Sequence, residues 1–362
     1  MVAKEKLSQE KRQYHTKDNM DVINGKSYKP EISPEIDTSI QRSSNSLLEV
    51  IKSLLSGKPA LLARTFQSVA KPPIGKNGLR LLQWNILAQG LCMGKDNFVR
   101  CPLEALDWGT RKLRIVEEIL QYDPDVICMQ EVDHFGYLEN ILQSVGFTGT
   151  FYPKPDSPAL YVENSNGPDG CAIFYRTEKF ELVETCTKIL MTNDENMTTN
   201  QVCVLNKLQH KGNSSDAFWV ATTHLKAKSG WNDLRESQGR YLLKYLKEIV
   251  GQSPLIVCGD LNAPPTEKVY EAFSSSDLEL QSAYKVANGG KQEPLYTTWK
   301  IRGGKGDTLE ESCRTIDYVW FNNKCQLNAV LNFPSGEEIG VERLPSFKYP
   351  SDHLSLVCDF SI

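Results

Sequence analysis

Short apolar runs rich in Val, Ile, Phe and Cys recur from Leu79 to the end of the chain, and they constrain the fold more than any other feature. One of them, LIVCG at 255–259, is apolar or small at successive positions, which indicates a strand buried on both faces. Pro264 and Pro265 prevent its continuation. The runs that we predict as strands are LRLLQWNIL, DVICMQEV, CAIFYR, QVCVLNKL, AFWVATTHL, PLIVCGDL, RTIDYVWF and LSLVCDFSI.

Two longer segments have the 3.6-residue period of helices. TRKLRIVEEILQY at 110–122 places Leu113, Val116 and Leu120 on one face, and WNDLRESQGRYLLKYLKEIV at 231–250 repeats the pattern. Strands and helices alternate without a strict strand–helix–strand repeat. The sequence therefore predicts an α/β domain of two packed, mixed β-sheets flanked by helices.

The first 75 residues differ in character from the rest. Residues 1–75 are polar and contain several prolines, so we predict that most of this region is disordered and that the domain spans 76–362. The exception is a short amphipathic helix near 46–56, which Gly57 is placed to end. Two interpretations of this helix stay open. It docks on the domain, or it recruits a protein partner or targets the chain.

Charge is distributed unevenly. Residues 1–75 carry 12 Lys and Arg against 8 Asp and Glu; since the whole chain has 41 and 45, residues 76–362 carry 29 and 37, a net charge of −8. Proteins that hold nucleic acid mainly by neutralising its phosphates show a basic surface instead. A domain of this charge must bind phosphates through a few well-placed cations.

Other sequence features bear on the compartment. No run approaches the roughly 18 apolar residues of a membrane-spanning helix, and the first residues lack the apolar segment of a secretory signal. The ten cysteines form no CxxC pair, so we expect reduced thiols rather than disulfides or zinc ligands. We expect a cytoplasmic monomer without a membrane span, with the mitochondrion as the alternative location.

Polar residues capable of chemistry stand at or beside the ends of the predicted strands. Any one of them has a structural explanation, such as a helix cap or a satisfied turn. Together they imply a site, because unpaired polar groups in buried sequence cost several kcal/mol. These residues are Asn85, Glu131, His224, Asp260, Asn262, Asp317, Asp352 and His353.

The donor atoms of this set are mostly carboxylate and amide oxygens. An EF-hand starting at Asp260 is excluded because Pro265 occupies the position that requires glycine, and the chain lacks GxxxxGK[ST], HExxH and GxSxG motifs. Oxygen donors favour Mg²⁺ or Mn²⁺ over zinc. The pattern indicates attack of water on a phosphoryl group, with a carboxylate activating the water.

The strand-end motifs WN, QEVDHF, THLKA, GDLNAPPTE, TIDYVW and YPSDH, in this order, resemble the endonuclease/exonuclease/phosphatase superfamily over Leu79 to Ile362. The resemblance implies a four-layer α/β sandwich. It also implies that Glu131 is the principal metal ligand, with Asn85 beside the metal and the phosphate.

The same resemblance assigns roles to the other strand-end residues. Asp260 would orient or deprotonate the attacking water, and Asn262 would hold it with the phosphate. His224 and His353 would contact the phosphoryl oxygens. Asp317 would orient His353, and Asp352 would belong to the same group of residues.

Longer strings, such as FYPKPDSP, NGPDGCAIFY and RLPSFKYPSDHLSLVCDF, resemble one member of the deadenylase-like branch of this superfamily. That resemblance implies Mg²⁺-dependent removal of the 2′-phosphate of NADP(H), with Mn²⁺ as a substitute for Mg²⁺. Lys154, Lys226, Lys228 and Arg302 match basic positions around the phosphates of the substrate. Lys228 departs from the arginine of that pattern and lacks its bidentate fork.

Two other functions remain to be distinguished. A 3′-exoribonuclease that shortens poly(A) shares this catalytic core, but it needs a cleft for a chain of phosphates and stacked bases, and the acidic domain weakens this alternative. A binding scaffold without activity would not need the matched catalytic residues, all of which are present. Parallel assays with NADPH and poly(A) discriminate the three.

Overall fold

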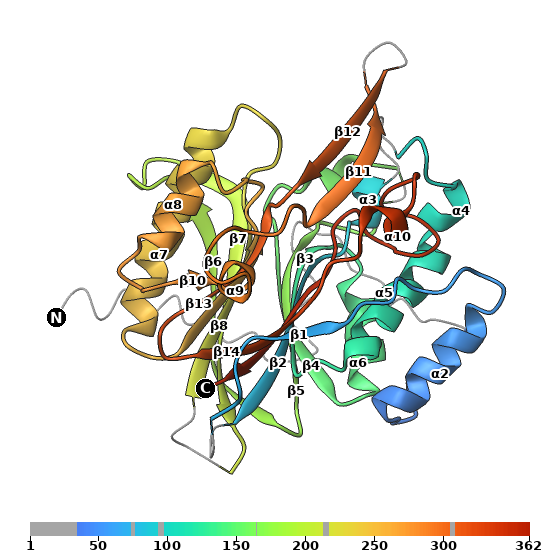
Figure 1. Ribbon diagram of the computed structural model, residues 1–362, viewed down its shortest axis with the longest axis horizontal. Helices are drawn as coiled ribbons and strands as arrows, with labels where there is room; N and C mark the ends of the chain where they lie inside the picture. The colour runs from blue at the N-terminus through green and yellow to red at the C-terminus, as the bar shows by residue number, and fades with distance from the viewer. Residues whose placement is uncertain (1–34, 74–76, 93–97, 164, 213–216, 305–307) are drawn as a thin grey trace.

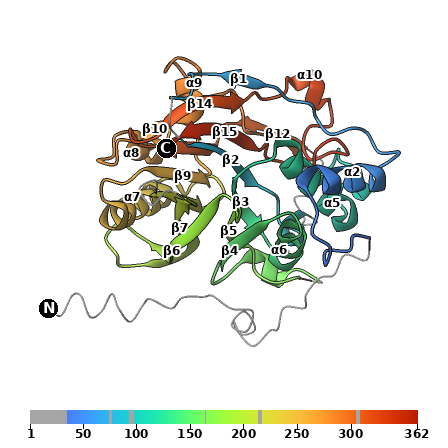
Figure 2. The same cartoon turned by 90° about the horizontal axis from the view of Figure 1, so that it is seen from below.

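The computed structural model describes residues 35–73, 77–92, 98–163, 165–212, 217–304 and 308–362. Within them, two β-sheets pack face to face and helices cover both outer faces, as the two views in Figures 1 and 2 show. This is the predicted architecture of two packed, mixed sheets flanked by helices.

The first sheet has the strand order β1-β14-β15-β2-β3-β5-β4. Its neighbours are antiparallel except β2 and β3, which run parallel. The strands are β1 Phe66–Ser68, β2 Gly78–Asn85, β3 Val126–Val132, β4 Phe147–Pro153, β5 Gly170–Arg176, β14 Gln326–Leu331 and β15 Leu356–Ser361.

The second sheet has the strand order β10-β13-β9-β8-β7-β6, with β8 and β9 parallel. A separate two-stranded ribbon of β11 and β12 projects at one end of the molecule (Figure 1). The strands are β6 Phe180–Met191, β7 Thr198–His210, β8 Ala217–His224, β9 Leu255–Asp260, β10 Gln281–Ser282, β11 Thr298–Gly303, β12 Leu309–Arg314 and β13 Asp317–Phe321.

Helices α2, α5 and α6 cover the outer face of the first sheet, and α7 and α8 cover that of the second (Figures 1 and 2). Apolar side chains form one core between the sheets and a further core beneath each group of helices. The helices are α2 Ser44–Leu54, α3 Gln89–Cys92, α4 Leu103–Leu106, α5 Trp108–Tyr122, α6 Phe135–Gln143, the 3₁₀ helix η1 Pro158–Tyr161, α7 Asn232–Val250, α8 Lys268–Ser274, α9 Ala283–Ala287 and α10 Gly336–Ile339.

Each of the eight predicted runs contains a strand, and both predicted helices are present. The ten cysteines are free thiols, as expected, and eight of them are buried. Among the described residues, no helix is both long enough and apolar enough to cross a membrane.

The expectation that residues 1–75 are mostly disordered is wrong for residues 35–73, while residues 1–34 lie outside the described part of the chain. Helix α2 is capped by Ser43 and buries Leu47, Leu48 and Ile51 in the core shared with α5. Strand β1 then pairs with β14 at the edge of the first sheet. The fold therefore begins before residue 76, and of the two interpretations of the helix the structure has the docked one.

The docking of α2 can be tested by truncating its buried face. Ile51 is 0% exposed, so Ile51→Ala should lower the free energy of unfolding by about 2 to 5 kcal/mol through lost burial and the cavity left behind. Leu54→Ala is the matched control, because Leu54 lies on the same helix and is 42% exposed. Urea denaturation of both variants measures the difference, and equal stabilities would show that α2 is not docked in solution.

Candidate active site

The predicted site residues converge because neighbouring strands of the two sheets end at the same place. Asn85, His224 and Asp260 are the last residues of β2, β8 and β9. Across the second sheet, Asp260 pairs in register with His224 on one side and with Asp317 on the other. Sheet register thus brings a carboxylate, an imidazole and a second carboxylate together.

Glu131 reaches the site through an irregular end of β3. Its φ is +55°, and the pairing of β3 with β5 shifts register between Met129 and Val132. This bulge turns the side chain toward the end of β2. There, Glu131 Oε2 accepts a hydrogen bond from the backbone N–H of Ala88 at 3.1 Å.

Asn85 connects Glu131 to Asp260. Its Nδ2 donates to Glu131 Oε1 and to Asp260 Oδ2, both at 3.0 Å, while its Oδ1 accepts from the N–H of Leu87 at 3.0 Å. The amide nitrogen of Asn85, not its oxygen, therefore faces the carboxylates. As a metal ligand, Asn85 would have to turn its side chain, so that role stays a prediction.

Asp260 is a buried carboxyl group with an altered proton affinity. Burial raises its pKa, the neighbouring charge of Asp317 raises it further, and together they bring it to about 7 in spite of His353 and Asn85. Its Oδ1 accepts from the backbone N–H of Asn262 at 2.8 Å. Asp260 consequently has the proton affinity of a base that works near neutral pH.

His353 and Asp317 form a buried pair beside Asp260. The ring nitrogen Nδ1 of His353 lies 2.9 Å from Asp317 Oδ2, and that oxygen also accepts from Thr297 Oγ1 at 2.6 Å. Burial would lower the pKa of His353, but Asp317 and Asp352 outweigh burial and raise it to about 9. His353 is therefore an imidazolium at neutral pH.

His224, unlike His353, is a neutral imidazole. Burial lowers its pKa well below the ordinary value, and the cations of Lys154 and His353 add to the effect. Nε2 lies 2.8 Å from Asn262 Nδ2, and Nδ1 lies 3.3 Å from Lys154 Nζ. The site thus contains one neutral and one charged imidazole, at 3.6 and 3.9 Å from Asp260 Oδ2.

Lys154 is built into the site more deeply than its predicted role as a substrate-binding cation requires. Its ammonium group is 2.6 Å from Asp169 Oδ2 and only 7% of the residue is exposed. The sequence interpretation did not include Asp169, which is fully buried and accepts a hydrogen bond from Ser157 Oγ. Lys154 therefore fixes His224 and contributes positive charge next to it.

The β11–β12 ribbon supplies the second pair of cations. Lys300 and Arg302 are two residues apart on β11, so their side chains lie on the same face of the ribbon, toward Asp352. Lys300 Nζ contacts Asp352 Oδ2, and Arg302 Nη2 lies 3.4 Å from the same oxygen. Burial would raise the pKa of Asp352, but Lys300 and His353 hold it well below its usual range. Arg302 also stacks on Phe98, 4.7 Å from the ring centroid. Lys300 was missed, although the i, i+2 spacing in WKIR was a usable signal.

Lys226 and Lys228 lie on the loop between β8 and α7, which the buried Arg235 holds. Its guanidinium donates to the carbonyl oxygens of Lys226 and Lys228 at 3.0 and 2.8 Å and forms a bidentate pair with Glu267 at 2.8 Å. Lys226 lies over Trp231, 5.3 Å from the ring centroid. Of the predicted substrate cations, Lys228 is exposed, Lys226 and Arg302 are half-buried, and Lys154 is buried.

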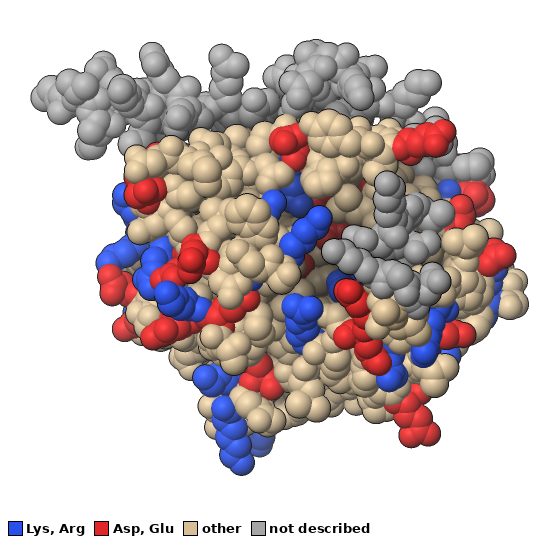
Figure 3. All heavy atoms as spheres, turned by 90° about the horizontal axis from the view of Figure 1, so that it is seen from above, with Lys and Arg blue, Asp and Glu red and all other residues tan. Residues whose placement is uncertain are grey.

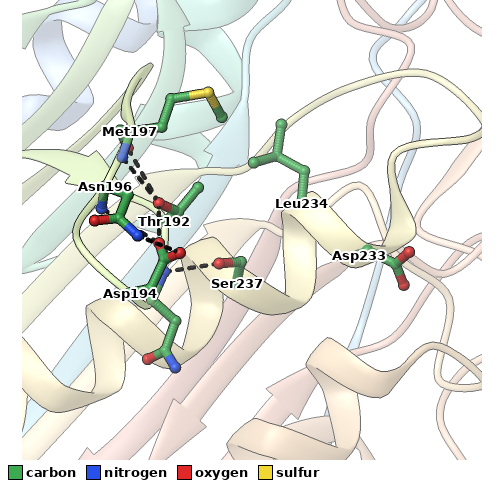
Figure 4. A pocket seen from close by; sticks show the side chains of 8 residues that line it. Thr192, Asp194, Asn196, Met197, Asp233, Leu234 and Ser237 are labelled. Carbon is green, nitrogen blue, oxygen red and sulfur yellow. Dashed lines mark hydrogen bonds between the residues drawn. The ribbon is translucent and has the colours of Figure 1, made fainter.

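Figure 3 looks onto the end of the molecule that carries the ribbon. Lys and Arg side chains border a hollow in the middle of this face, and Asp or Glu atoms are visible inside it. A different hollow, of about 500 Å³, lies between the β6–β7 turn and the start of α7 (Figure 4). It is lined by residues such as Asp194, Met197 and Ser237 and by none of the predicted site residues.

The residues present fit a divalent cation. Ligand atoms of Asp260 and Asp317 lie within 4.8 Å of one another beside the His353 ring, and burial, followed by the negative charge of Asp317, raises the pKa of Asp260. A cation at this place would neutralise that charge with oxygen ligands of the type that Mg²⁺ and Mn²⁺ prefer. This group is not the predicted set of Glu131 and Asn85 but adjoins it through Asn85.

Comparisons with known proteins agree with this geometry. Residues 82–353 match the Endonuclease/Exonuclease/phosphatase family. Nocturnin of Xenopus laevis is 48% identical over 322 residues, which are 87% of this chain and 81% of that protein. The human nocturnin catalytic domain, solved with a bound sulfate anion, has a TM-score of 0.68 and 42% identity and covers 82% of this chain and 97% of that one. The Candida glabrata CCR4-Not complex 3′-5′-exoribonuclease subunit Ccr4 is 28% identical over 320 residues, 78% of this chain and 36% of that protein.

The charge of His353 can be tested by removing its partner. In Asp317→Asn, burial is opposed by fewer carboxylates, so the pKa of His353 should fall by about one to three units from about 9. Imidazole resonances of the metal-free protein, followed by NMR across pH, measure the shift. Asp359→Asn is the control, because Asp359 pairs with Arg80 and is not among the carboxylates that raise the pKa of His353.

The same pair makes a pH-dependent contribution to stability. Because the pKa of His353 in the fold lies above the ordinary value of 6.5, the pair stabilises the fold fully below 6.5 and loses this effect as the pH rises through 9. A wild-type His353 that titrates near its ordinary value, or one that Asp317→Asn does not shift, would contradict this description.

Proposed function

The chain belongs to the Endonuclease/Exonuclease/phosphatase family and, within it, to the nocturnins, as its motifs predicted, and on this premise we propose that it is a Mg²⁺-dependent phosphatase that removes the 2′-phosphate of NADP(H). The observation that carries the proposal is the environment of Asp260. A carboxylate with a pKa of about 7 stands among a neutral imidazole, an imidazolium and an amide, within reach of one phosphoryl group.

In the proposed reaction, Asp260 takes a proton from the attacking water. The new P–O bond forms as the bond between phosphorus and the 2′-oxygen breaks. The 2′-oxygen takes up one proton, equivalent to the one that Asp260 received from water, and leaves as a hydroxyl group. The His353 imidazolium, oriented by Asp317, donates to a phosphoryl oxygen as negative charge grows there. Asn262 and His224, which are 2.8 Å apart, hold the phosphoryl group from the other side.

A bound divalent cation would neutralise charge on the phosphoryl oxygens. Glu131 would hold it from β3, next to the carboxylates of Asp260 and Asp317. The backbone N–H of Ala88 and the Asn85 amide already fix both oxygens of Glu131, so its carboxylate is oriented before any ligand arrives. Such orientation reduces the cost of binding.

The cations outside this cluster support a dinucleotide as the substrate. Arg302 and Lys300 stand on the ribbon, and Lys226 and Lys228 stand on the loop after β8. NADP(H) carries a diphosphate in addition to the scissile phosphate, and cations at two separate places suit two phosphate groups.

We propose that the enzyme acts as a monomer in the cytoplasm, with the mitochondrion as the alternative, and that the N-terminal region recruits partners.

The alternative substrate is poly(A). It is favoured by the similarity to Ccr4, whose name states a 3′-5′-exoribonuclease activity, although this chain spans about a third of that protein. The excess of acidic residues in 76–362 argues against a long polyanion.

The role of Asp260 is tested by Asp260→Asn, which keeps the shape and removes the base. The kcat should fall by about 10² to 10⁴-fold with little change in KM. The folded pKa of Asp260 is raised from 3.8 to about 7, so the carboxylate destabilises the metal-free fold increasingly as the pH rises through this window. The variant should therefore become more stable than wild type toward pH 7 by denaturation. A rise in KM alone would require another base.

The substrate is tested by parallel assays of the wild type with Mg²⁺, measuring phosphate released from NADPH and AMP released from oligo(A). Arg302→Ala should raise KM for NADPH roughly tenfold, since a well-formed cation–phosphate contact contributes about 1.5 to 3 kcal/mol. Arg343→Ala is the control. Arg343 stacks on Trp299, which is next to Lys300 on β11 and therefore points to the opposite face of the ribbon. Degradation of oligo(A) with NADPH left intact would replace the proposed substrate.

A further inference from the structure

Arg111, on α5, is a fully buried guanidinium that contacts two segments of the site. Its Nη2 donates to the carbonyl oxygens of Ile86 and Leu87 at 2.7 and 2.5 Å, and its Nη1 donates to Gln89 Oε1 at 2.6 Å. Its Nε donates to the carbonyl oxygen of Pro350 at 2.8 Å. One side chain therefore joins the segment after β2 to the segment before β15.

The first of these segments carries the groups that orient Glu131 and Asn85. The N–H of Leu87 donates to Asn85 Oδ1, and the N–H of Ala88 donates to Glu131 Oε2. Leu87 has a φ of +61°, a conformation that a leucine adopts at a cost and that its surroundings must maintain. Arg111 donates to the carbonyl oxygens of Ile86 and Leu87, so it holds the peptide groups before and after the Cα of Leu87.

The second segment carries Asp352 and His353. Pro350 is followed by Ser351, whose Oγ donates to the carbonyl oxygen of Asn85 at 2.6 Å and accepts from the N–H of His353 at 3.1 Å. Arg111 and Ser351 thus bridge the same two segments, Arg111 from the α5 side and Ser351 next to the catalytic groups.

The partners of Arg111 are neutral. Among the described residues, no carboxylate forms an ion pair with it, whereas Arg64 and Arg235, also well buried, each pair with a glutamate. Burial of a cation without a counter-ion is costly. The cost is understandable if the planar fork of donors does something that an apolar side chain of equal volume could not do.

We propose that Arg111 is a positioning residue for catalysis, which holds the segments 85–89 and 350–353 in a fixed relation. Through it, Asn85 and Glu131 on one side and Asp352 and His353 on the other face a common phosphoryl group. Arg111 does not touch substrate; it sets the distance between the groups that do. This inference rests on the proposed phosphoryl chemistry of the site but not on the identity of the substrate.

The test is chemical rescue. Arg111→Ala should lower kcat by about 100-fold, because small misplacements of catalytic groups have effects of this size, and should change KM by less than about threefold. Guanidinium at millimolar, non-denaturing concentrations should fill the space left by the side chain and restore kcat at least about tenfold. Arg111→Lys keeps the charge without the fork, so its kcat should stay well below wild type.

Arg114→Ala is the matched control. Arg114 lies on the same helix, is 3% exposed, and pairs with Glu117 and the carbonyl oxygen of Pro59. Its loss should lower stability, with kcat per folded molecule unchanged and no response to guanidinium. Circular dichroism and denaturation give the folded fraction of every variant, so that loss of fold is separated from loss of catalysis.

The outcomes are distinct. Rescue of Arg111→Ala alone supports the proposal. Wild-type kcat per folded molecule in Arg111→Ala or Arg111→Lys, or guanidinium that raises only the melting temperature, overturns it and leaves Arg111 a purely structural residue. A wild-type enzyme that hydrolyses neither NADPH nor a simple phosphate monoester refutes the proposed function instead.

Discussion

The crowding of negative charge at the abutting strand ends is the constraint on which the rest of the structure depends. Asp260 and Asp317 are opposed in register, and both are buried. Two carboxylates so placed cannot both be ionised cheaply. The structure responds with a protonated His353 against Asp317, the amide of Asn85 against Asp260, and a raised pKa for Asp260. The same imbalance makes the site suitable for a divalent cation and for a base that works near neutral pH.

Around this cluster, buried cations fix the conformation of the loops in addition to balancing negative charge. Lys154 fixes His224 through its pair with Asp169, and Arg235 fixes the loop of Lys226 and Lys228 through its pair with Glu267. Asp352 gathers Lys300 and Arg302 on the ribbon. The acidic domain can therefore bind phosphates, because its cations are placed at defined positions and not spread over the surface. The rigid sheets supply the frame, since each catalytic side chain lies at or next to a strand end.

The parts of this description that the sequence predicted are those with a local signal. Continuous apolar runs predicted the buried strands, and their polar ends predicted the site. At strand ends, polar side chains of neighbouring strands can meet without interrupting the hydrogen bonds between the strands. Strand β6 was not predicted because it is a partly exposed edge, and β1 because three residues become a strand only when β14 is beside them. Arg111 gave no signal, since three of its four hydrogen bonds go to backbone carbonyl oxygens that any sequence provides. Asp169 and Glu267 were quoted within motifs, but their partners lie 15 and 32 residues away.

The central claim is that water attacks phosphorus in a phosphate monoester held at Asp260. It is tested most directly by incubating the enzyme and Mg²⁺ with NADPH in water enriched in ¹⁸O and analysing the products by mass spectrometry. The account predicts release of inorganic phosphate that carries one solvent oxygen, together with unlabelled NADH. Label in the 2′-hydroxyl group of NADH, or cleavage of the diphosphate with the 2′-phosphate retained, would contradict it.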